Sequence, residues 1–549
     1  GEARLHTAHR TGIGGHACSP DGARLAYAAA FDPANPDETP PAADAPAPIR
    51  ATRRGDYKQD DDARGWVGET RAQIWTVDAA SGERRRLTSS PNDHAHPCWS
   101  PDGKTLAASV ARDSGVHSRL AIVDAGTGET RRFVGPEDGV VGCWAWSPDG
   151  RSLLYAGEES RSWQLDWRIA DAATGESRLI VEDPGIDLPA TWSIYGEPAM
   201  PVWIDDAHAL FIGERAAATG LWVLDVRDGS IATVRHDAAQ YAGLTADREG
   251  RRAAVISTTH DHLSEVLVVD LATGNGARVT GINDATLAET PLARSERFVV
   301  HRDGVDIDAW LLFPPGHDPA TRHPLVIDIH GGPNWYYGYD FSNVQQALAA
   351  AGNIVLYANP RGSTTYGREF TQAVTEDWGG EDYLDLMAAV EAAAARPDVD
   401  PARVGVYGYS YGGFMSSWMI GHTDRFRAAV IGAPVVDLVS FFGTSDIAAT
   451  WGARQFGRTP WSDLGWYRDH SPLTYLDRAT TPSLILHGEA DVRCPIGQGE
   501  QLYAALREVG VETEFVRYPG MTHLFPWGGE PVYVEDFLSR IVAWFGERL

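Results

Sequence analysis

The chain has 549 residues, a formal net charge of −28 at pH 7 and 43% hydrophobic residues. This length exceeds what one ordinary hydrophobic core holds, so two or three domains are expected. The excess of carboxylates disfavours nucleic acids and anionic membrane surfaces as partners, because both are polyanions.

The cysteine content indicates the redox environment of the chain. Its four cysteines form neither a disulfide framework nor a CxxC pair: Cys18, Cys98, Cys143 and Cys494. Thiols persist in a reducing compartment, so we expect a cytoplasmic location. No run of about 18 apolar residues is present, and a membrane span is not expected.

Residues 1–285 repeat a unit made of a strand ending in aspartate, a turn with glycine and a second strand. IWTVDAASGERRRLT at 74–88 and LAIVDAGTGETRRFV at 120–134 are examples. The strand-ending aspartates are Asp78, Asp124, Asp171, Asp225 and Asp270, at steps of 46, 47, 54 and 45 residues. A period in the forties with about four strands per repeat is typical of a β-propeller blade.

The repeats predict an all-β propeller over residues 1–285, with five clear repeats. A sixth or seventh blade is expected in the divergent start of the chain or in the junction near 281–300. A pair of β-sandwiches is the alternative, and the even spacing of the repeats disfavours it.

Residues 286–549 alternate strands with helices. The predicted strands are 323–330, 353–360, 402–410, 426–434, 483–491 and 513–520, and the clearest helices are 380–396 and 534–549. This alternation predicts a second domain with a mainly parallel sheet covered on both faces.

The motif Gly408-Tyr409-Ser410-Tyr411-Gly412 lies between a predicted strand and a helical run. A G-x-S-x-G motif in this context is typical of the nucleophile elbow of an α/β-hydrolase domain. Side chains at 408 and 412 would collide with backbone in so tight a turn. We therefore predict that Ser410 is a catalytic nucleophile.

A serine nucleophile needs a base and an acid, which follow it along the chain in α/β-hydrolases. His523 lies directly after the last predicted strand, where a loop can reach the nucleophile. Asp491 lies on the loop after strand 483–487 and is the expected acid, with Glu489 and Asp446 as rivals. The other downstream histidines, His422, His470 and His487, occupy less suitable positions.

The oxyanion of an acyl-transfer intermediate needs hydrogen-bond donors. The backbone N–H of Tyr411, the residue after the nucleophile, is one expected donor. A second is expected from the loop His330-Gly331-Gly332-Pro333, whose glycines let the backbone approach a substrate.

The motifs GYSYGGFM, HGGP, NPRGSTTYG, HGEADVRCP and YPGMTH together resemble the prolyl oligopeptidase family of serine peptidases. They are most similar to its bacterial acylaminoacyl-peptidase and dipeptidyl-peptidase-like branch. The resemblance implies a triad at Ser410, Asp491 and His523, backbone oxyanion donors at Gly332 and Tyr411, and a propeller that restricts access to short peptides. It also implies cleavage near blocked or free amino termini or after proline. The double-glutamate signature of dipeptidyl peptidase IV-like enzymes is not evident.

Phe441, Phe442 and Trp451 follow strand 426–434 and are candidate walls of an apolar specificity pocket. Ordinary core packing of these aromatic side chains is the alternative. The pairs His94/His96 and His260/His262 offer too few ligands for zinc and are expected to be solvated loop residues.

The predicted function is hydrolysis of short peptides by an acyl-enzyme mechanism, of the acylaminoacyl-peptidase or aminopeptidase-like type. An esterase or small-amide hydrolase would use the same residues, and a propeller binding module with an inactive hydrolase is a further alternative. No cofactor or metal is expected. The sequence is compatible with a homo-oligomer.

Overall fold

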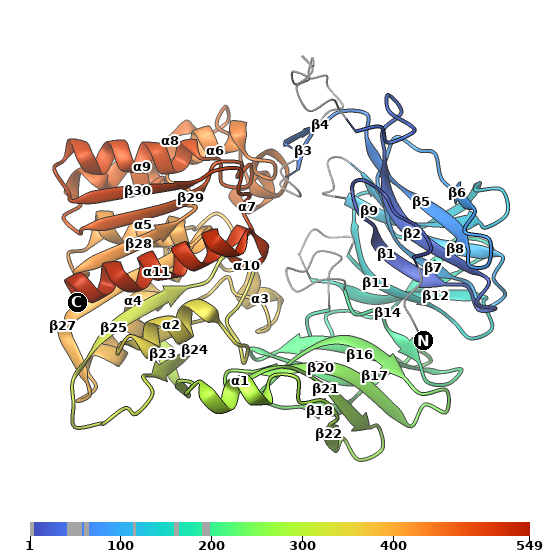
Figure 1. Cartoon of the computed structure of the whole chain (residues 1–549), viewed down its shortest axis with the longest axis horizontal. Helices are drawn as coiled ribbons and strands as arrows, with labels where there is room; N and C mark the ends of the chain where they lie inside the picture. Colours follow the sequence, from blue (N-terminus) through green and yellow to red (C-terminus); the bar gives the residue numbers. More distant parts are fainter. Residues whose placement is uncertain (1–4, 41–56, 60–64, 113–116, 159–163, 189–197) are drawn as a thin grey trace.

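Five four-stranded antiparallel sheets follow one another through the first half of the chain (Figure 1). The computed structural model describes residues 5–40, 57–59, 65–112, 117–158, 164–188 and 198–549. The strands of blades 1 and 2 are β1 Gly14–Cys18, β2 Arg24–Phe31, β5 Arg71–Asp78, β6 Arg84–Arg86, β7 His94–Trp99, β8 Thr105–Arg112, β9 His117–Asp124 and β10 Thr130–Val134. Two short strands, β3 Tyr57–Gln59 and β4 Gly65–Val67, pair with each other.

The remaining three blades have the same order of strands. Blade 3 has β11 Val140–Trp146, β12 Ser152–Glu158, β13 Asp166–Asp171 and β14 Ser177–Val181. Blades 4 and 5 have β15 Val202–Trp203, β16 His208–Arg215, β17 Ala218–Asp225, β18 Ile231–His236, β19 Gln240–Ala246, β20 Arg252–Thr259, β21 His262–Asp270 and β22 Gly276–Arg278. The predicted propeller is thus confirmed.

Consecutive blades are held together by shared apolar clusters. Trp144 of blade 3 packs with residues of blade 2, and Trp222 of blade 4 packs with residues of blade 3. Hydrogen bonds add to this packing, because Trp146 Nε1 donates to the carbonyl of Cys98 over 3.1 Å. Each sheet therefore buries its faces against its neighbours, as expected for a repeat array.

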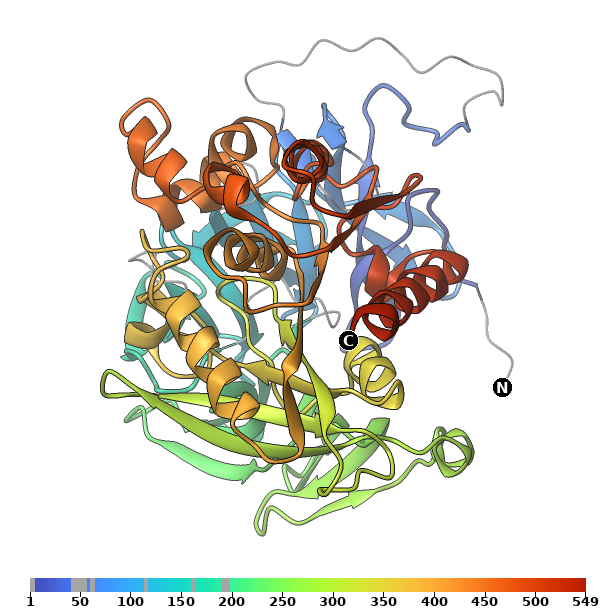
Figure 2. The same ribbon diagram turned by 90° about the vertical axis from the view of Figure 1, so that its left-hand side faces the viewer.

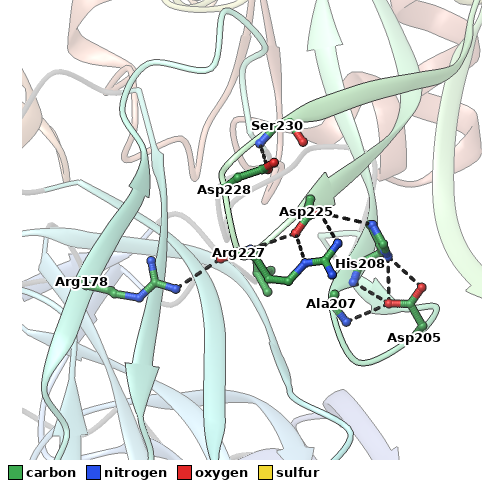
Figure 3. Close-up of polar contacts among 9 residues, drawn as sticks. Arg178, Asp205, Ala207, His208, Asp225, Arg227, Asp228 and Ser230 are labelled. Carbon is green, nitrogen blue, oxygen red and sulfur yellow. Dashed lines mark hydrogen bonds and ion pairs between the residues drawn. The ribbon is translucent and has the colours of Figure 1, made fainter.

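The strand-ending aspartates explain the repeated turn. The Oδ1 of Asp124 accepts the backbone N–H groups of Gly126 and Thr127 at 2.8 and 2.7 Å. Figure 3 shows the turn of blade 4, where Asp225 accepts the N–H of Arg227 at 2.9 Å. Short side-chain acceptors of this kind stabilise a tight turn locally, which is why aspartate recurs at each hairpin.

The expected sixth or seventh blade is absent from the part of the chain that the structure describes. The start of the chain supplies β1 of blade 1, and residues Arg294–Arg302 form β23 of another sheet. Strand β24, Val305–Phe313, pairs with β23, and its Trp310, Leu311 and Leu312 are at most 1% exposed. This hairpin completes the core of the second domain, so it is not free to form a blade.

The second half of the chain forms an eight-stranded sheet of order β23-β24-β26-β25-β27-β28-β29-β30. The first two pairings are antiparallel and the others are parallel. Its remaining strands are β25 His323–Ile329, β26 Ile354–Ala358, β27 Val399–Tyr409, β28 Ala428–Gly432, β29 Ser483–Gly488 and β30 Thr513–Tyr518. This arrangement confirms the predicted α/β-hydrolase domain.

Helices cover both faces of this sheet, with α2 and α11 side by side on one face and α4 on the other (Figure 2). The helices are α1 Asp284–Glu289, α2 Asn343–Ala350, α3 Arg368–Gln372, α4 Glu381–Ala394, α5 Tyr411–His422, α6 Leu438–Thr444, α7 Ala453–Phe456, α8 Leu464–Asp469, α9 Gly497–Glu508, α10 Phe525–Gly528 and α11 Pro531–Arg548. Helical turns η3 Ala448–Gly452 and η4 Pro472–Arg478 complete the domain. The predicted boundary at residue 285 falls in α1, and we keep it as a proposal.

Two carboxylates lie together where blade 4 meets the hydrolase domain. Asp187 and Glu214 exchange two backbone hydrogen bonds of 2.8 Å, and Asp187 Oδ2 accepts the N–H of Thr365 from the other domain. Burial, together with the charge of Asp187, raises the pKa of Glu214 to about 8. Burial likewise raises the pKa of Asp187 to about 6.

Replacing Glu214 with glutamine is expected to flatten the pH dependence of stability. A carboxyl group whose pKa is raised on folding stabilises the protein below its unfolded pKa, and this contribution disappears as the pH rises through the folded value. Between pH 5 and about 9 the melting temperature of the native protein should therefore fall more steeply than that of Glu214→Gln. Thermal denaturation across this range measures the difference, and parallel curves would refute the assignment of the proton to Glu214.

Candidate active site

Ser410 lies at the turn between β27 and α5, with φ 63° and ψ −119°. Its backbone is fixed by hydrogen bonds from its N–H to the carbonyl of Gly432 and from the N–H of Phe414 to its own carbonyl. A Cβ at Gly408 would lie 2.2 Å from the oxygen of Gly412, and a Cβ at Gly412 would lie 2.1 Å from the oxygen of Ile329. The steric need for glycine at both positions is thus confirmed, and the turn leaves the Ser410 side chain partly exposed.

Two further loops bring an imidazole and a carboxylate to the same edge of the sheet. His523, after β30, places Nε2 2.9 Å from Ser410 Oγ. Its Nδ1 lies 2.7 Å from Oδ2 of Asp491, which follows β29. Parallel strands end at one edge, so residues distant in sequence meet there. The result is a continuous hydrogen-bonded chain of serine, histidine and aspartate.

The rival acids point elsewhere. Glu489 Oε1 lies 3.7 Å from the guanidinium of Arg517, and Asp446 forms an ion pair with Arg493 at 2.8 Å. Of the three carboxylates predicted from the sequence as candidates, Asp491 is the one hydrogen-bonded to His523.

Asp491 is buried, and its surroundings hold it in the charged form. Its Oδ1 accepts the N–H of Cys494 at 2.7 Å. Burial alone would raise the pKa of Asp491, but the adjacent imidazoles of His523 and His487, through charge and hydrogen bonding, hold the pKa well below its usual range. A charged carboxylate can stabilise an imidazolium at His523.

His487, whose position in the sequence suits a catalytic base less well than that of His523, also lies next to Asp491. Its Nε2 is 3.4 Å from Asp491 Oδ2 and 2.6 Å from the carbonyl of Cys494. Because a carbonyl only accepts, Nε2 must carry the proton. His487 therefore donates to the loop that carries the acid, a role its position four residues before Asp491 could have suggested.

The glycines of the predicted oxyanion loop lie beside the nucleophile. A Cβ built at Gly331 would lie 3.7 Å from the Cβ of Ser410. Gly332 has φ 123°, and a Cβ there would lie 2.8 Å from the backbone nitrogen of Asn334. Only glycine fits this conformation comfortably. The loop is thus close enough to offer an N–H group to a substrate on Ser410.

Tyr411 heads helix α5, and its buried phenol reaches away from the nucleophile. Its OH donates to Oδ2 of Asp382, which also accepts the N–H of Gly379. Burial raises the pKa of Asp382 to about 7. Trp378 packs edge-on against the Tyr411 ring at 5.2 Å. These contacts fix the backbone that carries the Tyr411 N–H.

Replacing Tyr411 with phenylalanine is expected to lower kcat about tenfold with little change in KM, because a slightly displaced N–H stabilises the oxyanion less well. Steady-state hydrolysis of an aminoacyl-anilide measures both constants. Tyr467→Phe is a matched control, because this buried phenol donates to the carbonyl of Arg458. Equal losses in the two variants would point to a general effect of removing a buried hydroxyl.

The three candidate specificity residues have different surroundings. Phe441 and Phe442 are 2% and 9% exposed and belong to the hydrophobic core of the domain. Trp451 is partly buried, with its ring 5.9 Å from that of Trp378, which contacts Tyr411. Trp451 is therefore the aromatic side chain of the three that we retain as a proposed pocket wall.

Other features bear on binding and location. Within the described part of the chain, no three His, Cys, Asp or Glu side chains gather into a group that could hold a metal ion. His94 and His260, expected to be solvated, are 2% and 7% exposed. His94 begins strand β7, and His260 lies in a turn that contacts the hydrolase domain. Among the helices that the structure describes, none has the length and apolarity needed to cross a membrane.

A β-propeller joined to an α/β sheet with a nucleophile elbow is the architecture of a propeller-bearing serine hydrolase. Residues 339–549 match the sequence profile of the prolyl oligopeptidase family. The chain is 34% identical over 506 residues to the uncharacterized peptidase YuxL of Bacillus subtilis, covering 90% of this chain and 76% of that protein. The chain belongs to the prolyl oligopeptidase family of serine peptidases, as its motifs predicted.

The chain is also similar to a second relative and to solved structures. It is 27% identical over 370 residues to dipeptidyl-peptidase 5 of Porphyromonas gingivalis, covering 63% of this chain and 51% of that protein. The acylaminoacyl peptidase of Pyrococcus horikoshii has the same fold, with a TM-score of 0.81 and 21% identity over 98% of this chain and 82% of the other. A Mycobacterium tuberculosis puromycin-hydrolyzing peptidase gives a TM-score of 0.72 and 22% identity, over 98% and 79% of the two chains.

Proposed function

We propose that this family member hydrolyses short peptides with Ser410, His523 and Asp491 as its catalytic triad. The hydrogen-bonded chain of 2.9 and 2.7 Å from Ser410 through His523 to Asp491 is the observation that carries the proposal. When Nδ1 of His523 carries the proton and donates it to Asp491, Nε2 is free of a proton and can accept the hydrogen bond from Ser410.

The proposed reaction is acyl transfer in two steps. His523 takes the proton of Ser410 as Oγ attacks the substrate carbonyl, and then gives it to the leaving amine. His523 then takes a proton from water, which attacks the carbonyl of the resulting ester. As the bond between this carbon and Ser410 Oγ breaks, His523 returns the proton to Oγ and the acid leaves. The oxyanion formed in each step would lie between the N–H groups of Gly332 and Tyr411.

The substrates proposed are short peptides cut near an amino terminus, as in acylaminoacyl-peptidases or aminopeptidase-like enzymes. The similarity to proteins named acylaminoacyl peptidase and dipeptidyl-peptidase 5 supports this class. A cytoplasmic location is proposed with it, in keeping with a sequence whose four cysteines include no CxxC pair.

A direct test of the site is labelling with a fluorophosphonate, which reacts with activated serines. Peptide mapping should place the adduct on Ser410, and an unlabelled protein would contradict the proposed triad. A digest of a peptide library with free and blocked amino termini, read by mass spectrometry, defines the substrate class. Hydrolysis of ester substrates without any peptide cleavage would favour an esterase instead.

A further inference from the structure

The segment Trp335–Gly338, here called the clamped segment, follows directly on the oxyanion glycines of the hydrolase domain. It joins the loop at Gly331 and Gly332 to helix α2. The side chain of Tyr336 and the carbonyl of Gly338 face the propeller, whereas the side chain of Tyr337 packs into the hydrolase domain. Any displacement of this segment would be transmitted to the glycines through three intervening peptide bonds, those of Pro333, Asn334 and Trp335.

The turn between β16 and β17 of blade 4 and Gln240, the first residue of β19 in blade 5, contact the clamped segment together. The amide of Gln240 donates to the carbonyl of Ala217 over 3.0 Å and accepts the OH of Tyr336 over 3.1 Å. A Cβ at Gly338 would lie 2.1 Å from Gln240 Nε2 and 2.3 Å from the oxygen of Ala217. The two domains are therefore so close here that only glycine fits at 338.

Blade 5 contacts the same segment through His260, at the turn between β20 and β21. Its Nε2 lies 2.8 Å from the carbonyl of Gly338 and 2.7 Å from the OH of Tyr357. Its Nδ1 lies 2.8 Å from Ser295 Oγ. The imidazole thus connects blade 5 to the clamped segment and to two strands of the hydrolase sheet.

A second connection reaches the segment through Thr364 and Thr365 of the hydrolase domain. The N–H groups of Ala216 and Ala217 donate to the carbonyl and the hydroxyl of Thr365, at 2.8 and 2.9 Å. The neighbouring Thr364 donates its N–H to the carbonyl of Trp335 over 3.1 Å. The turn of blade 4 thereby supports the clamped segment both directly and through the loop at 364–365.

We propose that blades 4 and 5 position the oxyanion loop, with Gln240 and His260 as positioning residues supplied by the propeller. The inference rests on the proposed function, because it assigns a role to the Gly332 N–H. The propeller is then part of the geometry that stabilises the transition state, in addition to limiting access. Removing contacts between the propeller and the clamped segment should weaken binding of the oxyanion more than binding of the ground-state peptide.

Gln240→Leu tests this proposal, because leucine fills the space but makes neither hydrogen bond. We expect kcat to fall about tenfold while KM changes by less than about twofold. Affinity for a peptide boronate, which forms a tetrahedral adduct with serine, should fall in parallel with kcat. Arg368→Gln is the control: it removes the 3.1 Å contact with Asp166 of blade 3, another bridge between the domains, and should leave kcat within about twofold.

Amide hydrogen exchange of residues 331–339, measured by mass spectrometry, provides a readout that does not depend on turnover. Faster exchange in Gln240→Leu than in Arg368→Gln, together with the loss of kcat, supports the proposal. Faster exchange with unchanged kcat would overturn the claim that the position of the loop affects catalysis. Unchanged exchange would overturn the claim that Gln240 holds the loop in place. Turnover that does not require Ser410 would instead refute the proposed function, whatever the exchange shows.

Discussion

Replacing Ser410 with alanine is expected to lower kcat for an aminoacyl-anilide at least about 10⁴-fold, toward the level left by binding and oxyanion contacts alone. Without Oγ no acyl-enzyme can form, and His523 has no proton to accept. A water molecule in its place would lack the fixed position, 2.9 Å from Nε2, that the elbow gives the hydroxyl.

The variant should remain folded, because the change removes one oxygen from a partly exposed side chain and leaves the backbone contacts of residue 410 in place. Circular dichroism and the melting temperature check this point. Turnover of Ser410→Ala close to that of the native protein, after excluding contaminating hydrolases, would leave the proposed mechanism without a nucleophile.

Replacing Asp491 with asparagine is expected to lower kcat about 10⁴-fold while preserving the fold. The N–H of Cys494 requires an acceptor at the Oδ1 position, so the amide oxygen should occupy that position. The amide NH₂ then faces Nδ1 of His523, which must become an acceptor. The proton moves to Nε2, and the imidazole can no longer accept the proton of Ser410.

Glu489→Gln is the matched control for this change. It neutralises a carboxylate on the same loop, but this carboxylate faces Arg517 and not His523. Its kcat should stay within about twofold of native, as expected for a weak exposed pair. A larger loss in Glu489→Gln than in Asp491→Asn would reverse the assignment of the acid.

The sequence predicted the parallel strands themselves well, because most of them are buried apolar runs. The hairpin of β23 and β24 is not predicted from the sequence, which indicates a junction near 281–300. Yet Asp303 and Gly304 both have positive φ, 50° and 78°, as an Asp-Gly hairpin turn requires. That dipeptide between two apolar runs was a usable signal.

The residues of the proposed triad could be named from sequence because each lies at or just after the carboxyl end of a predicted strand, and parallel strands end together. The residues that contact the site from other helices or from the propeller could not be predicted in this way. Asp382 contacts Tyr411 from a helix 29 residues earlier, and His260 meets Gly338 across 78 residues and a domain interface. Contacts of this kind depend on how helices and domains pack, which periodicity and local motifs do not determine.

Among the described residues, apolar clusters join the five sheets in series, and the residues that contact the segment after the oxyanion glycines belong to the last two sheets. Such an array is modular. Whole modules can be inserted or deleted at the blade 1 end while the junction with the hydrolase stays intact. Propellers of different size can therefore evolve on one unchanged chemical centre.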